Sequence, residues 1–206
     1  MAFPKILIIA AVAASLGACV SGSKQFLKKP FVAPSSIAVL PMNNHTNDLD
    51  GPVIVRHAFD ERIASKKGYR TKDLVSIDAG LKALGITDGG QLPSVTPQRL
   101  GETLGVEALV YGELLDFGYK TTGFLNIRSV RAKFRMVDAK SGELLWEKEA
   151  RSAKSTAALS AGDALKKGLA HIGSQVAGKI GRNPLREQVE DMAWDAIEFL
   201  PRGGAH

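Results

Sequence analysis

The stretch VRAKFRMV, residues 130–137, decides the fold, because apolar and basic side chains alternate along it. Alternation with a period of two is typical of a strand that buries one face and leaves the other in water. The next five residues, DAKSG at 138–142, have a turn-forming composition, and residues 143–151 return through Leu144 and Trp146. The pattern therefore predicts an antiparallel hairpin.

Upstream of the hairpin, the pattern predicts two strands separated by a helix. The apolar run at residues 36–41 ends in proline and is typical of a buried strand. A polar loop at 43–51 leads into a helical pattern over 53–64, with Val53, Phe59 and Ile63 among its apolar positions. Gly68 ends this helix, and residues 69–77 are expected to return as a strand.

A second helix has clear start and stop signals. Thr96 supplies a capping hydroxyl and Pro97 stands at the first helical position. The helix is expected to run to about Leu104, where Gly105 can adopt the left-handed conformation of a C-terminal turn. Residues 108–117 follow as the next strand.

The chain is expected to close with two amphipathic helices. The first has an apolar stripe at spacings of three and four, formed by Leu165, Leu169, Ile172, Val176 and Ile180. Asn183 and Pro184 begin the second, whose stripe is Leu185, Val189, Met192, Ala196 and Leu200. Pro201 ends it. Strands and helices in this order predict an α+β fold.

The N-terminus has the pattern of an export signal. Lys5 provides a positive charge, and the apolar run at 6–14 is shorter than the roughly 20 residues that span a bilayer. The segment LGAC at 16–19 resembles the bacterial lipobox, which implies cleavage before Cys19 and acylation of that residue. The alternatives are an ordinary signal peptide and a membrane anchor. Either one explains the charge and the apolar run, but not why the chain's only cysteine, Cys19, stands at the end of a lipobox.

These patterns divide the chain into a signal peptide at 1–18, a lipidated tether at 19–34, an α+β domain at 35–181 and a C-terminal helix and tail at 182–206. The tether is expected to be extended around its two prolines. Val20 stands where an acidic residue would retain an enterobacterial lipoprotein at the inner membrane. Resemblance to that sorting rule implies the outer membrane, with the body on its periplasmic face.

Composition narrows the class of protein. The chain has 206 residues, 45% hydrophobic and 23% charged, as expected for a globular body. The formal charge is +6, and loss of the leader removes Lys5 alone. No dense basic block with interleaved aromatic residues occurs, so nucleic acid is not an expected partner. With one cysteine, no disulfide within the chain can form.

Three segments in the same order resemble a known group of proteins: residues 37–43 (IAVLPMN), 104–112 (LGVEALVYG) and 137–146 (VDAKSGELLW). They are similar to the TolB N-terminal-like fold, which is shared by the curli secretion lipoprotein CsgG and the penicillin-binding-protein activator LpoB. Among these, the chain most resembles a family of bacterial lipoproteins of unknown function that includes the meningococcal antigen of the GNA series.

The resemblance covers about residues 35–181 and implies a mixed sheet packed with helices, with the last helix as an addition. Genes of this family typically lie beside a CsgG-like lipoprotein. The chain departs from the common pattern at Met42, in place of Phe, and at Lys140, in place of Thr. It lacks an obvious long amphipathic hairpin of the kind that CsgG uses to build a pore, so it is not expected to form a channel.

Candidate chemistry is sparse. His45, Asp48 and Asp50 lie in the polar loop, but their spacing lacks the later ligands of a calcium loop, and such residues are ordinary turn formers. No nucleophile elbow accompanies His57 or His171, and no glycine-rich segment has phosphate-loop spacing. The sequence therefore predicts no catalytic site, no metal and no cofactor.

Two sets of residues are candidates for binding a partner. Arg131, Lys133 and Arg135 project from one face of the predicted strand and would form a basic strip. The alternative is a solvated face, or one covered by a helix with acidic partners. Trp194 and Phe199 lie off the main stripe of the last helix, where they either bind a partner or cover the edge of the core.

The favoured hypothesis is a lipid-anchored, protein-binding accessory of a CsgG-like secretion or assembly system in the cell envelope. An LpoB-like regulator of a cell-wall synthase is the alternative, and an enzyme ranks third. The expected partners are the membrane, through the N-terminal lipid, and other envelope proteins. The sequence leaves the oligomeric state open.

Overall fold

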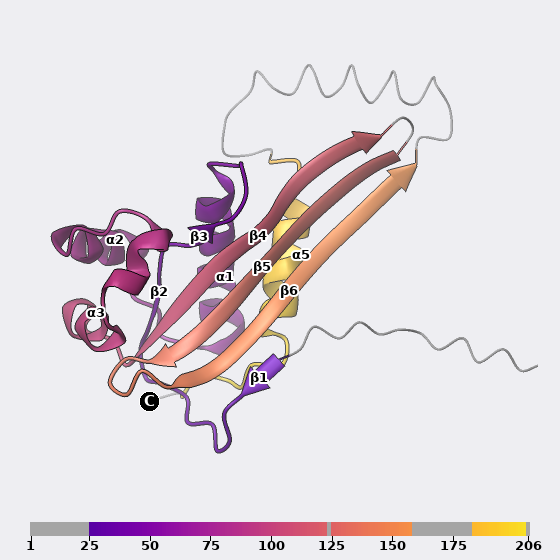
Figure 1. Cartoon of the computed structure of the whole chain (residues 1–206). Coiled ribbons are helices and arrows are strands. Elements are labelled where there is room, and N and C mark those ends of the chain that lie inside the picture. Colours follow the sequence, from indigo (N-terminus) through magenta and orange to yellow (C-terminus); the bar gives the residue numbers. More distant parts are fainter. Residues whose placement is uncertain (1–24, 123–124, 158–182, 205–206) are drawn as a thin grey trace, which may run out of the picture.

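The computed structural model describes residues 25–122, 125–157 and 183–204. In these ranges one mixed sheet has the strand order β1-β6-β5-β4-β2, and β3 also pairs with β4 (Figure 1). Its strands are β1 (Gln25–Leu27), β2 (Ile37–Val39), β3 (Asn43–Asn44), β4 (Ala108–Thr122), β5 (Leu125–Asp138) and β6 (Leu144–Ala157). The helices are α1 (Gly51–Lys67), α2 (Leu74–Ala83), the 3-10 helix η1 (Gly89–Ser94), α3 (Pro97–Leu104) and α5 (Arg186–Ile197). The α+β class with a mixed sheet and a C-terminal helix is confirmed.

The predicted hairpin is present as β5 and β6. Asp138 closes its turn, because Oδ1 accepts hydrogen bonds from the backbone N–H groups of Lys140 (3.1 Å) and Ser141 (2.7 Å). Gly142 has a φ of 76°, which a residue with a side chain adopts with strain. The turn therefore fixes the register, with Lys133 opposite Glu149 and Arg135 opposite Glu147.

The strands are longer than expected. β4 continues past Phe117 to Thr122, β5 begins at Leu125, and these two strands pair along their whole length. The two strands therefore form a longer hairpin than the sequence pattern indicated, and nothing in their pairing tests whether the chain has an amphipathic hairpin of the pore-forming kind. The outer half of β4 is half-buried and then exposed, so its side chains need not alternate between apolar and polar.

One face of the sheet, called the back face below, packs against α1 and α5 (Figure 1). Phe134 of β5 stacks on Phe59 of α1 with ring centroids 4.0 Å apart, and Trp146 of β6 stacks beside Phe59 at 6.4 Å. All three side chains are buried. Burial of such aromatic groups is the main stabilising contribution at this layer.

The last helix belongs to the same core. Its predicted stripe is buried in full, at Leu185, Val189, Met192, Ala196 and Leu200. Asn183 is not the helix cap that the sequence predicted, because the N-cap of α5 is Leu185 and no side chain caps it. Asn183 Oδ1 instead accepts from the backbone N–H of Leu185 at 2.8 Å, in a turn just before the helix. The C-terminal helix therefore packs on the same core as the strands before it. The predicted stripe at 165–180 lies outside the described residues.

Two segments differ from expectation. Residues 69–77 do not form a strand, because Asp73 caps α2 by accepting a hydrogen bond from the backbone N–H of Ser76 (2.8 Å). In that segment, Thr71 alone bridges to the sheet, at Ile37. Likewise, part of the predicted tether is structured, since β1 pairs antiparallel with residues 146–148 of β6.

The second predicted helix is confirmed as α3. The Thr96 hydroxyl accepts from the backbone N–H of Arg99 (3.4 Å), and Gly105 ends the helix with a φ of 63°. Together with η1, α3 flanks the sheet beside β2 and β4 (Figure 1). Leu92, Leu100 and Leu109 are buried at this end, which leaves the upper parts of β4, β5 and β6 uncovered by these two elements.

Candidate protein-binding surface

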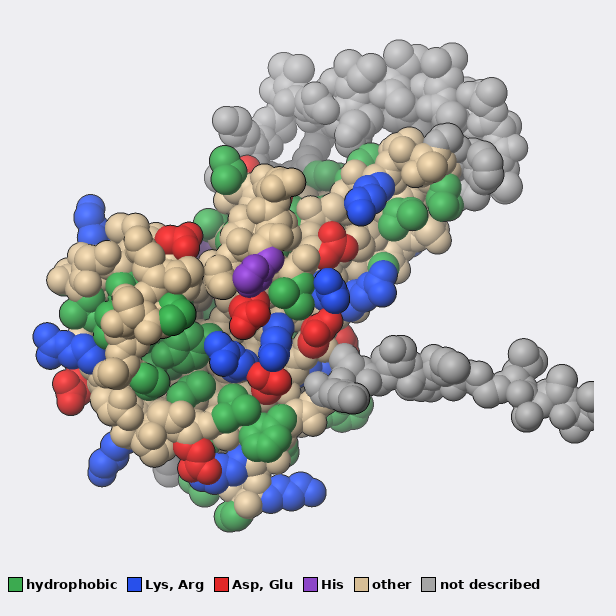
Figure 2. Space-filling view, viewed as in Figure 1, with side chains coloured by type: hydrophobic (Ala, Val, Ile, Leu, Met, Phe, Trp, Pro, Cys, Tyr) green, Lys and Arg blue, Asp and Glu red, His purple; other side chains and the backbone are tan. Residues whose placement is uncertain are grey.

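The front face is the side of β4, β5 and β6 opposite α1 and α5. Side chains alternate along a strand, and Phe134 is buried on the back face. Its two neighbours on β5 therefore point to the front face. Figure 2 looks onto this face and shows acidic and basic side chains interspersed along the strands. Six of these residues form what we call the charge ladder: Glu113, Arg131, Lys133, Arg135, Glu147 and Glu149.

Each predicted cation on β5 has an acidic partner on a neighbouring strand. Arg131 lies 3.3 Å from Glu149 and Lys133 lies 3.0 Å from Glu147, both on β6. Arg135 lies 3.8 Å from Glu113 on β4. The predicted basic strip is therefore wrong as a description of charge, because three cations face three carboxylates. The partners come from strands and not from a covering helix.

The charge ladder contributes little to stability, since exposed ion pairs are each worth at most about 1 kcal/mol. Its effect is to hold long side chains in a fixed pattern of alternating charge. Such a pattern favours a partner with the complementary arrangement over a generic polyanion, which needs a uniformly basic surface. The front face is therefore suited to selective recognition of a protein.

A shallow groove borders the charge ladder beside η1 and α3. It has a volume of about 360 Å³ and is lined by Leu92, Pro93, Val95, Pro97, Tyr111 and Arg135, among others. The guanidinium of Arg135 lies 5.7 Å from the centre of the Tyr111 ring. Burial raises the pKa of Tyr111, while the nearby Arg135 opposes that shift. Tyrosine and arginine anchors beside an apolar groove are typical of protein interfaces.

Trp194 and Phe199 lie on the other side of the sheet. Trp194 is 48% exposed, and the guanidinium of Arg62 lies 5.8 Å from its ring centre. Phe199 is 66% exposed, and the ammonium of Lys148, a back-face residue, lies 5.3 Å from its ring. The structure therefore does not bring the two predicted sets together, and the helix residues form a separate candidate surface.

Lys148 is a buried cation that the sequence patterns did not single out. It is 3% exposed, and its ammonium donates to Asp195 of α5 at 2.9 Å. A buried charge needs such a partner to offset its desolvation. This pair fixes α5 against β6 and so has a packing role.

The polar loop before α1 is held by its own turns. Asp48 Oδ1 accepts from the backbone N–H groups of Asp50 (3.0 Å) and Gly51 (2.6 Å), at the start of α1. His45 Nε2 lies 3.1 Å from Asn43 Nδ2 and 3.8 Å from Glu113. These contacts are those expected of turn formers. In the part of the chain that the structure describes, no three His, Cys, Asp or Glu side chains gather as a metal site would require.

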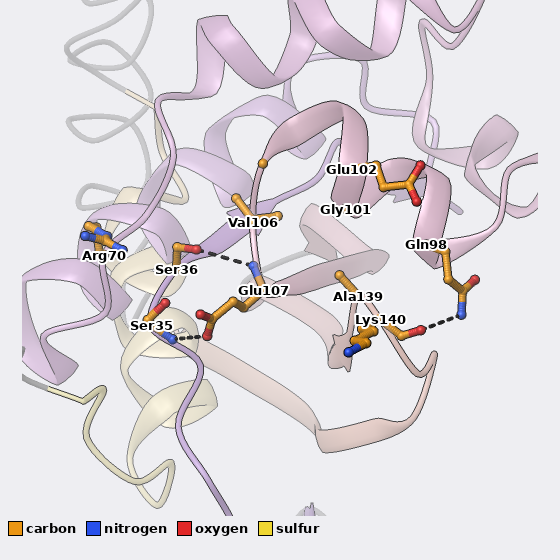
Figure 3. Close-up of a pocket in the computed structure, with 11 residues that line it drawn as sticks. Ser35, Ser36, Arg70, Gln98, Gly101, Glu102, Val106, Glu107, Ala139 and Lys140 are labelled. Atoms are coloured by element: carbon orange, nitrogen blue, oxygen red, sulfur yellow. Dashed lines mark hydrogen bonds between the residues drawn. The ribbon is translucent and has the colours of Figure 1, made fainter.

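A second cavity, of about 490 Å³, lies where β2 begins, near the end of α3 and the β5–β6 turn (Figure 3). Ser35 donates its backbone N–H to Glu107 Oε2 at 2.7 Å. Gln98 Nε2 donates to the carbonyl of Lys140 at 3.1 Å. These bonds join the chain before β2 to β4, and α3 to the hairpin turn, so the cavity's polar groups serve to position its walls.

Cys19 lies outside the described residues, and its lipidation stays a prediction. Among the helices that the structure describes, none is long and apolar enough to cross a bilayer.

Comparison with known proteins identifies relatives. The GNA1162-like lipoprotein family matches residues 28–184. Lipoprotein NMB1124/NMB1162 of Neisseria meningitidis serogroup B is 31% identical over 146 residues, which make up 69% of this chain and 67% of that protein. The crystal structure of lipoprotein GNA1162 from Neisseria meningitidis superposes with a TM-score of 0.55 at 25% identity, covering 71% of this chain and all of that one.

The hypothetical protein CT253 from Chlamydia trachomatis shares the fold, with a TM-score of 0.52 at 12% identity over 81% of this chain and 95% of that one. The family match spans most of the chain and includes all three motif segments. It confirms the resemblance drawn from those motifs. The chain therefore belongs to the GNA1162-like lipoprotein family.

Proposed function

We propose that this protein is a periplasmic lipoprotein, anchored to the outer membrane through Cys19, that binds other proteins as an accessory of a CsgG-like secretion or assembly system. Membership of a lipoprotein family and the lipobox support the anchor. The resemblance to proteins encoded beside CsgG-like lipoproteins supports the choice of system.

The observation that carries the binding role is the open front face. A strand of 14 residues, β5, has one face packed under α1 and α5, while the other presents the charge ladder and the adjoining groove. Tyr111 and Arg135 belong to both the sheet and the groove, so an apolar anchor and ordered charges lie side by side. Apolar anchors supply affinity, and surrounding charges supply selectivity.

The proposal involves no catalysis. Burial raises the pKa of Asp60 on α1, while a hydrogen bond with Thr71 and the charge of Arg56 lower it. Burial also raises the pKa of Tyr69, whose hydroxyl donates to the carbonyl of Pro201 at 3.1 Å. The Tyr69 hydrogen bond joins the segment after α1 to the C-terminal residues.

Co-purification of the lipidated protein from solubilised membranes tests the role. The wild type should retain an envelope protein, and Tyr111→Ala with Arg135→Ala should lose it while the protein stays folded. Leu49→Ala with Val75→Ala is the matched control, because both side chains are exposed and neither lines the groove. A CsgG-like partner supports the proposal, a penicillin-binding protein supports the LpoB-like alternative, and retention by the groove variant contradicts this site.

A further inference from the structure

The outer part of β4 has a free edge among the residues that the structure describes. β2 pairs with Ala108, Leu109 and Val110, and β3 pairs with Glu113 and Leu114. Beyond Leu114, β4 pairs with β5 alone, up to Thr122. An extended edge with unpaired N–H and C=O groups is a template for another strand.

The backbone groups that face outward along this edge follow from the pairing below it. The carbonyls of Val110 and Leu114 point outward, since they accept from the backbone N–H groups of Leu40 (2.9 Å) and His45 (2.9 Å). The side chains of Val110 and Leu114 are buried on the back face. On β4, therefore, the residues whose side chains lie on the back face are those whose N–H and C=O groups point outward, toward the edge. The register shifts between Leu114 and Asp116, so Phe117, opposite the buried Val130, next lies on the back face. Phe117 and Tyr119 therefore direct their backbone groups outward.

The side chains along this edge are complementary to a second, inverted copy of themselves. With Gly118 facing Gly118 in an antiparallel pair, Asp116 of each copy lies opposite Lys120 of the other on the front face. Phe117 lies opposite Tyr119 on the back face. The same register makes Phe117 and Tyr119 the hydrogen-bonded pair, which agrees with their outward N–H and C=O groups. Opposite charges and aromatic pairs at directly facing positions stabilise antiparallel strands.

We propose that two copies of this chain associate through antiparallel pairing of their β4 edges, centred on Gly118. Shifting the register by one residue on each strand, to centre on Tyr119, places Asp116 opposite Thr122 and loses both charge pairs. Lys120 has no ion-pair partner among the described residues, and Asp116 uses one carboxylate oxygen, Oδ2, to accept from Ser129 (2.6 Å). Both groups can therefore meet a partner across the interface.

The other exposed edge is less suited to a second copy. β1 already occupies residues 146–148 of β6, and the backbone N–H of Arg151 donates to Asp195 at 3.3 Å. The rest of this edge carries Arg151 and Lys154, and basic residues on an edge strand discourage pairing. Charge and hydrogen bonding thus favour the β4 edge.

Disulfide trapping of the full-length chain in cells tests the register. Gly118→Cys places two thiols at a non-hydrogen-bonded pair, where α-carbons are about 4.5 Å apart, within the range of a disulfide. A β-carbon at Gly118 meets Asp116 Oδ1 at 3.4 Å, an ordinary contact, so the substitution fits. The expected result is a dimer that disappears on reduction and is the main product under oxidising conditions.

The matched controls use neighbouring positions. Lys120→Cys alone should give little dimer, because its two copies lie roughly 13 Å apart, four residues along the strand. Co-expression of Asp116→Cys with Lys120→Cys should restore the disulfide between unlike chains. Val75→Cys on α2 measures chance collisions between anchored molecules. If Gly118→Cys yields no more dimer than Val75→Cys, the proposed pairing is wrong.

A charge exchange tests the same interface without cysteines. Asp116→Lys and Lys120→Asp should each abolish the dimer seen by sedimentation of the detergent-solubilised lipoprotein, because each brings like charges face to face. The double variant should recover it. A dimer in both single variants, or none in wild type, would refute the proposal, and neither outcome bears on partner binding at the groove.

Discussion

The two faces of β5 differ in what their side chains contribute. On the back face, Ala132, Phe134 and Met136 are at most 1% exposed and pack under α1 and α5. On the front face, their neighbours Arg131, Lys133 and Arg135 stay in contact with water and pair with carboxylates. Burial stabilises the back face, whereas the front face adds little to folding and is free to serve recognition.

The largest effect is expected from the back face. Trp146→Ala should lower the free energy of unfolding by about 3–5 kcal/mol, because it removes a fully buried aromatic side chain and leaves a cavity. Urea unfolding of the protein measures this. Glu147→Ala, the next residue on the same strand but on the front face, should cost at most about 1 kcal/mol. Equal shifts in the two variants would erase the distinction between the faces.

Reversing the β5 cations sharpens the comparison. Arg131→Glu, Lys133→Glu and Arg135→Glu together place new carboxylates beside Glu113, Glu147 and Glu149, so the structure predicts a destabilisation of about 1–2 kcal/mol that salt reduces. Adding the reverse changes at those three glutamates, each to Lys, should restore most of the loss. Melting curves at low and high salt provide the measurement. A salt-independent loss would mean that packing, not charge, holds these side chains.

A smaller, pH-dependent effect is expected at the hairpin turn. Hydrogen bonds from Ser141 hold the pKa of Asp138 below its ordinary value, so the ionised form stabilises the folded state. That stability is fully present above a pH of about 4, the unfolded pKa, and is lost as the pH falls through the lower, folded value. Asp138→Ala should therefore cost about 1 kcal/mol at neutral pH. A difference from wild type that stays constant into strong acid would count against this role.

The smallest effect on stability is expected from Trp194→Ala with Phe199→Ala. Both rings are largely exposed, so their cation–π contacts with Arg62 and Lys148 are expected to add little to the stability of the fold. The double variant should melt close to wild type and keep its envelope partner if the front face is the binding surface. Loss of the partner from a folded double variant would transfer the binding role to the helical side.

The elements with strong local signals were predictable from the sequence. Asp138 to Gly142 marked the hairpin turn, Thr96 and Gly105 bounded α3, and the apolar stripe of α5 gave its buried face. Residues 69–77 do not form the expected strand because Asp73 caps α2. This local hydrogen bond outweighs the strand preference of the β-branched residues that follow. β1 was missed because three residues gain their structure only by pairing with distant β6.

The candidate site was half predictable. Alternation placed Arg131, Lys133 and Arg135 on one face, but their acidic partners were overlooked. The turn at 138–142 implies that residue numbers on β5 and β6 mirror each other, which puts Glu147 and Glu149 beside these cations. Tyr111 has a weaker signal, since the groove depends on η1 and α3 folding against β4, and strand periodicity alone does not reveal that contact.

Photocrosslinking in intact cells tests most directly whether the front face binds protein. A photoreactive amino acid is placed singly at Tyr111 in the groove, at Trp194 on α5 or at Val75 on α2. Val75 is exposed and does not line the groove. The structure predicts a specific adduct with an envelope protein from position 111 and none from 194 or 75. Adducts from position 194 without any from 111 would contradict the account.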